Sequence, residues 1–565
     1  MNGPHPNPLP GGEGTFPQRL GVVAAGSLKQ GLTIRLEPDV SPESVRVGQY
    51  VTIRGEERDY LGIVTDIGLD VIDPALARLP PDLTDPFTVE VLRGTAAYGV
   101  LTVLPQLAVP PGAAEGDIAP AKTVPAHYRP VWRAAEGEFA RVFGADDRHH
   151  ISIGTPLDME VRLCLDHRRL VERSNGVFGK SGTGKTTFTR LMLACLIQKG
   201  AAVNLIFDMH NEYGWEGTSE SYGRVKGLKQ LYGPRVAVFT LDEQSARRRN
   251  VPVDHVMRIS YSSIVPEDMF LLREPLTLHE RGLDDIQALA ERYGDDRWLG
   301  TFLSSKNEDI LPELKERGME VVPGTLRALR QSLRRLERYS FLTPEAPRDL
   351  HDNEIRSVEL MLRYLEQGTH VVLEFGGHQE DIAAYVLVAN LITRRLHERY
   401  VERTEAALGD RTAEPPQVVI TLEEAHRFLS SAVAGQTIFG RIAREMRKYH
   451  VTLLVIDQRP SAIDLEVMSQ IGTKVAFLLD DERDVEAVLA GVAGRGELRS
   501  VLARLESREQ VLLFGHALPM PVVARVREYG SPESYRELAF QEAVALGRAA
   551  EGEGAPVRPP RGAFG

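Results

Sequence analysis

The sequence predicts an α/β protein with a mostly parallel sheet as its core, an N-terminal small β-barrel, a helical insertion and a C-terminal tail. After Ile151, short apolar runs alternate with helix-length segments, which is the pattern of strands joined by crossover helices. Between Gly21 and Leu104, by contrast, short runs rich in Val, Ile and Thr are separated only by turn residues. Such runs favour a small antiparallel barrel or sandwich.

Length and composition indicate several globular domains. The chain has 565 residues, of which 42% are hydrophobic and 26% are charged, and these values match ordinary folded proteins. The net charge of −12 argues against a protein that coats nucleic acid with its whole surface, although it is compatible with a local basic channel. The two cysteines, Cys164 and Cys195, are too few for a disulfide framework, so we expect a reduced, cytoplasmic setting.

No apolar run approaches the roughly 18 residues that a membrane-spanning helix needs. The longest clean run, 384–392, is typical of a buried helix, and we expect a soluble protein with no membrane partner. The first residues are rich in Pro and Gly and lack the apolar segment of a signal peptide. We therefore expect no folded structure at the N-terminus.

The predicted barrel includes residues 87–94 as one of its strands, and residues 113–150 read as a strap or linker. The core strands are expected at 175–178, 203–207, 236–241, 370–375, 418–422, 452–456, 474–479 and 510–514. The gap between the third and fourth is too long for one crossover and contains leucines at helical spacing, so it is assigned to an inserted helical subdomain.

These patterns divide the chain into six predicted segments. They are a disordered N-terminal extension (1–16), the β-barrel domain plus linker (17–150), the first part of the core (151–265), the helical insertion (266–364), the second part of the core (365–528) and a C-terminal tail (529–565).

One motif fits the phosphate-binding pattern G-x-x-x-x-G-K-[ST] in full. It consists of Gly179, Lys180, Ser181, Gly182, Thr183, Gly184, Lys185 and Thr186, and is followed by Thr187. Its glycines let backbone amides wrap closely round a phosphate, and the start of the next helix strengthens anion binding. Lys185 is suited to reach the β- and γ-phosphates, and the Thr186 hydroxyl is suited to Mg²⁺. The motif therefore predicts binding of ATP with Mg²⁺.

Two acids follow the predicted strand 418–422. A strand that ends in acids is what phosphate transfer needs opposite the phosphate loop: one acid for the metal and one to polarise the attacking water. We assign the metal role to Glu423 and the base role to Glu424, although the usual first acid is Asp. The alternative is a solvated helix start with acids near its positive end.

Further candidate residues follow the acids. Gln458, at the end of the predicted strand 452–456, is a candidate for contacting the γ-phosphate or the water, unless it only caps a loop before Pro460. Arg441, Arg444 and Arg447 recur at a spacing of three, which places them on one helical face. An arginine from a neighbouring subunit can neutralise the charge on a transferred phosphoryl group. The alternative is an ordinary solvated face.

A polar loop follows the predicted strand 203–207. Its Asp208, His210 and Glu212 are candidates to line the site or form a conformational switch, because open α/β sheets place ligands at the carboxyl ends of strands. A separate metal site is the less favoured alternative to a hydrogen-bonded loop.

Taken together, five segments resemble the HerA family of hexameric ATPases, relatives of the FtsK-type DNA pumps. They are GKSGTGKTT, DMHNEYGW, EEAHRF, GRIAREMRKY and DQRPSAID. The phosphate loop is shared by very many ATPases, so the combination and order of the later motifs carry the resemblance. The resemblance implies a RecA-like P-loop ATPase core, with counterparts for the barrel, the insertion and a C-terminal brace.

The resemblance further implies a homohexameric ring that encircles double-stranded DNA and moves along it using ATP. A NurA-like nuclease would dock on the barrel and resect DNA ends for recombinational repair. In that framework the residues acting within one protomer are Lys185, Thr186, Glu423, Glu424 and Gln458. The residues reaching a neighbouring protomer would be Arg441, Arg444 or Arg447, and Arg173, just before the loop, is a candidate for nucleotide sensing.

Three other functions fit the same motifs. They are an ATPase ring that activates an effector in an anti-phage defence complex, a conjugation or secretion ATPase, and a structural nucleotide-binding ring without turnover. The identity of the partner protein would decide whether the first function applies, and the lack of a membrane segment weakens the second.

Residues contacting DNA are the hardest to assign. Residues 247–249 and the basic face near Arg334 are candidates for a pore lining, against the alternative of a solvated surface.

Overall fold

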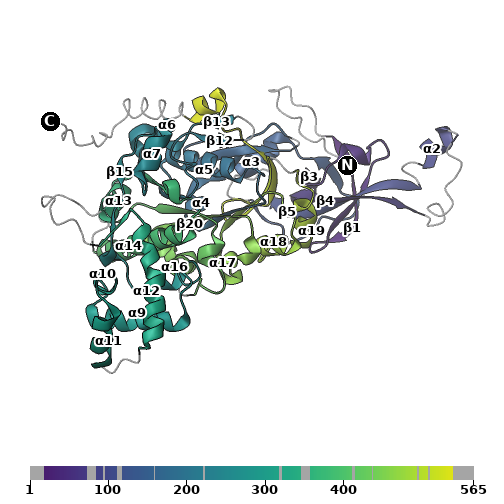
Figure 1. Ribbon diagram of the computed structural model, residues 1–565. Helices are drawn as coiled ribbons and strands as arrows, with labels where there is room; N and C mark the ends of the chain where they lie inside the picture. The colour runs from purple at the N-terminus through teal and green to yellow at the C-terminus, as the bar shows by residue number, and fades with distance from the viewer. Residues whose placement is uncertain are drawn as a thin grey trace.

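The computed structural model is drawn in Figure 1. It describes residues 18–72, 84, 86–92, 96–110, 118–157, 159–219, 223–316, 321–344, 357–409, 414–435, 437–492, 495–506 and 509–538. The expected N-terminal extension and the part of the expected tail after residue 538 lie outside the described residues.

The N-terminal domain is a closed barrel of six strands, as the sequence predicts. Its strands are β1 (Arg19–Ser27), β2 (Gly31–Leu36), β3 (Tyr50–Arg54), β4 (Asp59–Val71), β5 (Ala97–Val109) and β7 (Pro130–Arg133), and the short β6 (Ala119–Pro120) pairs with β5. The order is β2-β1-β7-β3-β4-β5, and pairing of β5 with β2 closes the barrel. Alternate residues of β2 are fully buried, which is the pattern of a strand with one face toward a core.

Two expectations for this domain were incomplete or wrong. Residues 87–94 were expected to form a strand, but residues 87–92 belong to the helix α2 (Pro86–Leu92), and residues 93 and 94 lie outside the described residues. β4 and β5 pair with each other as far as Val71 and Ala97, so α2 lies in the connection between two paired strands, and its backbone groups are satisfied within a helix rather than by a strand partner. The expected strap also contains β7, which lies between β1 and β3 and completes the barrel.

The core is a sheet of twelve strands that is mostly parallel, as predicted. Its order is β15-β14-β18-β11-β19-β20-β10-β21-β22-β23-β8-β9, and the pairs from β15 to β21 are parallel. The bounds are β8 (His150–Pro156), β9 (Leu163–Asp166), β10 (Asn175–Phe178), β11 (Val203–Asp208), β14 (Val236–Thr240), β15 (His255–Val256), β18 (His370–Glu374), β19 (Val418–Glu423), β20 (Val451–Asp457), β21 (Thr473–Ala476), β22 (Gln510–Gly515) and β23 (Val522–Val526).

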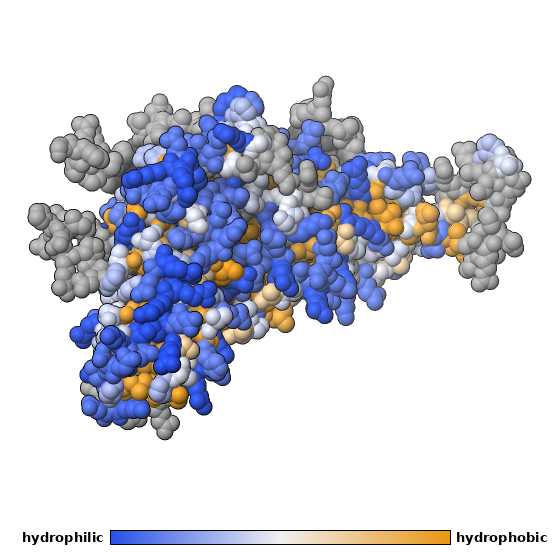
Figure 2. All heavy atoms as spheres, in the orientation of Figure 1, coloured by the Kyte–Doolittle hydropathy of each residue, from blue (hydrophilic) through white to orange (hydrophobic). Residues whose placement is uncertain are grey.

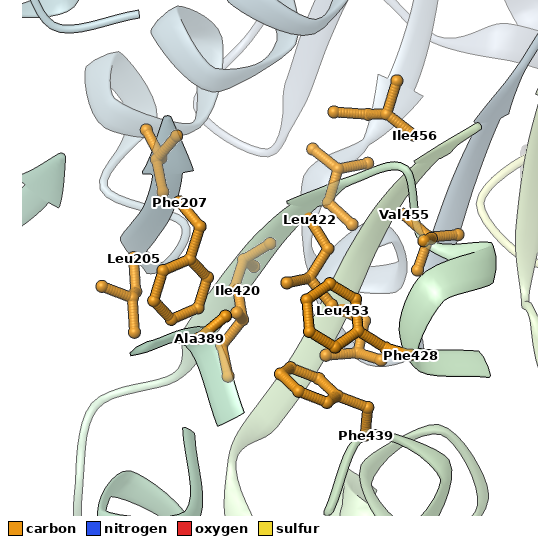
Figure 3. Close-up of a cluster of buried hydrophobic side chains, with 14 of the residues drawn as sticks. Leu205, Phe207, Ala389, Ile420, Leu422, Phe428, Phe439, Leu453, Val455 and Ile456 are labelled. Carbon is orange, nitrogen blue, oxygen red and sulfur yellow. The ribbon is translucent and has the colours of Figure 1, made fainter. Parts of the chain in front are cut away.

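Helices connect the strands and cover the sheet (Figure 1). They are α3 (Glu136–Phe143), α4 (His167–Val171), α5 (Lys185–Lys199), α6 (Leu228–Tyr232), α7 (Glu243–Arg249), α14 (Ile382–Ala407), α15 (His426–Leu429), α16 (Ile438–Glu445), α17 (Leu465–Gln470), α18 (Glu482–Val488) and α19 (Arg495–Leu502). Figure 3 shows how one face is sealed: Phe428 and Phe439 lie over Leu453, and their ring centroids are 4.6 Å apart. Among the described residues, no helix has both the length and the apolar character needed to cross a membrane.

A helical subdomain is inserted between β15 and β18, as expected, and its helices α9 to α12 form the lower left of Figure 1. Its helices are α8 (Asp268–Leu271), α9 (Glu280–Tyr293), α10 (Trp298–Ser304), α11 (Asn307–Glu316), α12 (Pro323–Leu333) and α13 (Ser357–Glu366). Leu326, Leu329 and Leu333 of α12 are buried, which accounts for their helical spacing. The domain boundaries themselves stay predictions.

Shorter elements complete the described part of the chain. They include two pairs of strands, β12 (Gly217–Ser219) with β13 (Gly223–Val225) and β16 (Ile259–Ser260) with β17 (Leu342–Thr343). They also include a short helical segment over 532–538, at the start of the expected tail. It packs on its own chain, where the Tyr529 hydroxyl donates to the Lys226 carbonyl and the Tyr535 hydroxyl accepts from the Lys226 amide.

Candidate functional site

The phosphate loop joins β10 to α5 at the carboxyl edge of the sheet. Gly184 precedes the helix with a φ of 102°, a conformation that L side chains rarely adopt. A Cβ added to Gly179 would lie 2.6 Å from Cβ of Phe477 on the neighbouring chain segment. Glycine is therefore required at both ends of the loop, which wraps closely enough to surround a phosphate with backbone amides.

The phosphate loop encloses the side chain of Lys185. Nζ of Lys185 donates to the carbonyl oxygens of Gly179 and Lys180, both at 2.7 Å. Burial lowers the pKa of Lys185 to about 8, against the opposing effect of Glu424, Asp457 and Glu423. The ammonium group thus lies between the phosphate loop and three carboxylates, which is the position needed to bind phosphate oxygens.

The loop and the predicted acids share one pocket of about 530 Å³. Residues 181–187 line it from the loop side, and Glu423, Glu424 and Gln458 line it from β19 and β20. These residues are distant in sequence, and they converge because the parallel strands β10, β20 and β19 lie side by side and end at the same edge. The convergence was expected from the strand pattern, and the site roles assigned to these residues remain predictions.

The two acids differ in their surroundings. Glu423 is buried, and burial followed by repulsion from Asp208 raises its pKa to about 8. Its Oε1 accepts a hydrogen bond from the Tyr213 hydroxyl at 2.9 Å, whereas its buried Oε2 has no hydrogen-bond partner among the described residues. Glu424 is half-buried and has a φ of 49°, a left-handed conformation that is rare outside glycine. Backbone strain of this kind is concentrated at functional sites.

Asp457, at the end of β20, links the acids to the expected γ-phosphate sensor. Its buried carboxylate accepts hydrogen bonds from the His426 amide at 2.7 Å, from Nδ1 of His426 at 2.9 Å and from the Arg459 amide at 2.7 Å. Nδ1 of His426 also lies 3.7 Å from the Glu424 carboxylate. The Asp457 carboxylate therefore holds the chain on both sides of Gln458, which is exposed. The Gln458 side chain lies at the pocket wall.

The polar loop after β11 reaches the same pocket. His210 and Glu212 line it, whereas Asp208 is fully buried behind them. The Asp208 carboxylate accepts hydrogen bonds from the amides of three successive residues, 212 to 214. Among the described residues no group of three or more His, Cys, Asp or Glu side chains is arranged to hold a metal ion. The three hydrogen bonds to Asp208 fit the interpretation of a hydrogen-bonded loop.

Arg441, Arg444 and Arg173 are not among the residues that line this pocket. Arg441 and Arg444 are on α16, which begins after β19, and the side chain of Arg447 lies outside the described residues. Arg444 contacts Glu466 at 3.4 Å, whereas no carboxylate of the described residues forms an ion pair with Arg441. Arg173 precedes β10, at the opposite end of that strand from the phosphate loop. The roles of all four arginines stay predictions.

Several pocket residues were missed from the sequence. Phe477 lies against the phosphate loop, and residues 526–529, at the end of β23 and just after it, form another wall together with Glu509. Behind the pocket, Tyr213 binds Glu423. Phe477, Glu509 and residues 526–529 belong to no local motif, because they reach the pocket through the order of strands in the sheet.

The arginines considered for a pore, 247–249, are each close to an acid of the same chain. Arg247 pairs with Glu243, Arg248 lies 3.9 Å from Asp242, and Arg249 pairs with the fully buried Glu374. Burial raises the pKa of Glu374, and Arg249 opposes that effect. These contacts account for the cluster without DNA.

We expect Arg249→Ala to destabilise the protein by about 3 kcal/mol, because it leaves the Glu374 carboxylate buried without its counter-charge. The matched control is Arg247→Ala, which removes a solvent-exposed ion pair on the same helix and should cost less than about 1 kcal/mol. Thermal unfolding of the two variants checks the difference. Equal unfolding midpoints would contradict this role for Arg249.

The family model described as "Helicase HerA, central domain" matches residues 151–396. The DNA double-strand break repair helicase HerA of Sulfolobus acidocaldarius is 23% identical over 506 residues, which cover 88% of this chain and 92% of the relative. The protein of the same name from Sulfurisphaera tokodaii is 23% identical over 525 residues, which cover 90% and 93%.

Solved structures with a similar arrangement include two bacterial proteins. VirB4 of Thermoanaerobacter pseudethanolicus has a TM-score of 0.43 at 14% identity and covers 69% of this chain and 99% of that chain. The bacterial conjugative coupling protein TrwB has a TM-score of 0.43 at 8% identity and covers 70% and 92%.

Proposed function

Because this chain belongs to the HerA family and is an ATP-hydrolysing enzyme, we propose that it is an ATP-driven double-stranded DNA translocase or helicase. It works as a homohexameric ring with a NurA-like nuclease in DNA end resection and recombinational repair. The observation that carries the proposal is the convergence of Lys185, Glu424 and Gln458 on one pocket in a chain of this family.

Each pocket residue has a part in hydrolysis. The loop amides and Lys185 bind and orient the phosphates of ATP. Glu424, at the pocket wall, accepts a proton from the attacking water, and Gln458 contacts the γ-phosphate or that water. His426 and Asp457 hold the two segments that carry these side chains.

The residues present also fit a divalent cation. Glu423 has one buried oxygen without a partner among the described residues, and the Thr186 hydroxyl lines the same pocket. A carboxylate and a hydroxyl are oxygen ligands of the kind that Mg²⁺ takes beside ATP. When bound, Mg²⁺ neutralises charge on the phosphates, and Thr186 and Glu423 would hold it.

The barrel supports the nuclease part of the proposal. Its strands β4 and β5 project from the molecule (Figure 1), and Leu69 on β4, Ile72 just after it and Phe87 on α2 are 82%, 61% and 72% exposed. Apolar residues are also seen along this end of the molecule in Figure 2. Several large apolar side chains exposed at one end of a domain are typical of a surface that binds another protein.

Linear duplex DNA is expected to raise ATP turnover several-fold, because a translocase couples hydrolysis to movement on its track. Binding should weaken steeply with salt, since the contacts are mainly to phosphates. The measurement is steady-state ATP hydrolysis with and without linear duplex, together with DNA binding at increasing salt concentration. If DNA neither stimulates turnover nor binds in a salt-dependent way, the DNA-motor proposal fails.

A further inference from the structure

Glu423 occupies a position where the usual acid is Asp, which has a side chain shorter by one methylene. The longer carboxylate is tied back inside the protein: its Oε1 accepts a hydrogen bond from the Tyr213 hydroxyl at 2.9 Å. Tyr213 is fully buried, so this bond is shielded from water. The pairing joins the loop after β11 to the end of β19, two strands that lie side by side in the sheet.

The position of Tyr213 is itself fixed. The Asp208 carboxylate accepts a hydrogen bond from the Tyr213 amide at 2.8 Å and another from the Glu212 amide at 2.7 Å. Nε of the buried Arg190, on α5, donates to the Glu212 carbonyl at 2.9 Å. The loop is thus anchored to both β11 and α5, and the tyrosine hydroxyl is presented to Glu423 by a rigid support.

A second tyrosine holds the backbone of the same glutamate. The Tyr385 hydroxyl donates to the Glu423 carbonyl at 2.9 Å and accepts from its amide at 3.1 Å. The backbone and Oε1 of Glu423 are therefore both held, while Oε2 is buried and has no partner among the described residues. A buried carboxylate oxygen without a partner is costly unless a ligand supplies one.

We propose that Tyr213 is a positioning residue that lets glutamate serve in place of the usual aspartate. By binding Oε1 it turns the longer side chain so that only Oε2 is offered to the divalent cation that accompanies ATP. This inference rests on the proposed function, in which that cation binds between Glu423 and Thr186.

The test is Tyr213→Phe, which keeps the ring and removes only the hydroxyl. The matched control is Tyr385→Phe, because it removes an equally buried hydroxyl that contacts only the backbone of Glu423. Binding of Mn²⁺ is followed by electron paramagnetic resonance in the presence of ADP, and binding of ADP alone is measured in a chelator. Both readouts are independent of turnover.

We expect Tyr213→Phe to weaken Mn²⁺ binding at least tenfold, as loss of a partner of a metal ligand commonly does. Binding of ADP without metal should be unchanged, and Tyr385→Phe should change Mn²⁺ binding by less than about threefold. Wild-type Mn²⁺ affinity in Tyr213→Phe would overturn the proposal. An equal loss of metal-free ADP binding would also overturn it, since the tyrosine would then only support the fold of the pocket.

A double-mutant cycle with Glu423→Asp keeps the proposal testable even if Tyr213→Phe alone perturbs the fold. The shorter aspartate cannot reach the Tyr213 hydroxyl in the same way, so Tyr213→Phe should have little further effect on Mn²⁺ binding in that background. A full tenfold effect there would contradict the proposal. If the wild type itself fails to bind Mn²⁺ with ADP, the proposed function fails; if the wild type binds and Tyr213→Phe matches it, only this inference fails.

Discussion

The Glu424→Gln variant is expected to hydrolyse ATP on the order of 10³-fold more slowly than the wild type while still binding ATP. Glutamine has the same shape as glutamate but cannot accept the proton of the attacking water. Lys185 and the loop amides, which would bind the phosphates, are unchanged. The loss should therefore be seen in the turnover number and not in the affinity for nucleotide.

Glu509→Gln is the matched control, because Glu509 lines the same pocket from the start of β22 but was not assigned to the chemistry. Steady-state hydrolysis and equilibrium binding of a fluorescent ATP analogue separate the two effects. Near-normal turnover in Glu424→Gln would show that Glu424 is not the base. A matching loss in Glu509→Gln would indicate that any change of charge in the pocket suppresses hydrolysis.

Much of the fold could be predicted from the sequence, because strands that are buried in a parallel sheet consist of short runs of apolar residues. All eight strands expected in the core are present, with ends that shift by a few residues. The phosphate loop and the acids after β19 could also be located, since each follows an apolar strand and parallel strands end at the same edge.

The parts that could not be predicted depend on tertiary pairing. Residues 86–92 have the β-branched composition of a strand, yet they form α2 because β4 and β5 use each other as partners. In β7 only Val131 is fully buried, so its few residues carry almost no pattern, although they close the barrel. Local propensity is a weak guide where pairing decides the outcome.

Part of the site could not be predicted from the sequence either, because it also depends on tertiary pairing. Tyr213 lies in the segment DMHNEYGW, but its contact with Glu423 spans 210 positions of the chain and depends on β11 lying beside β19. Residues 526–529 belong to no motif and reach the pocket only because β23 ends beside it. Side chains that support a catalytic group leave little trace in a single sequence, whereas phosphate-binding loops have a fixed spacing.

Arg441→Ala is expected to lower ATP turnover on the order of 10³-fold without unfolding the protein. This prediction rests on the proposed ring, in which α16 of one protomer faces the pocket of the next. Arg441 is exposed on α16 and has no ion-pair partner among the described carboxylates, so its guanidinium is available to neutralise a phosphoryl group of the neighbour. Arg444, which contacts Glu466, should have the smaller effect of the two.

The action in trans can be tested by mixing subunits. An Arg441→Ala subunit keeps its own Glu424, and a Glu424→Gln subunit keeps its own Arg441. Where the two subunits meet in one order, the site contains Glu424 from the Arg441→Ala subunit and Arg441 from the Glu424→Gln subunit. A mixture of two nearly inactive proteins should therefore regain part of the turnover. Arg444→Ala and Arg447→Ala, mixed in the same way, identify which arginine acts. If Arg441→Ala alone is inactive and mixing restores nothing, Arg441 does not act across the subunit boundary.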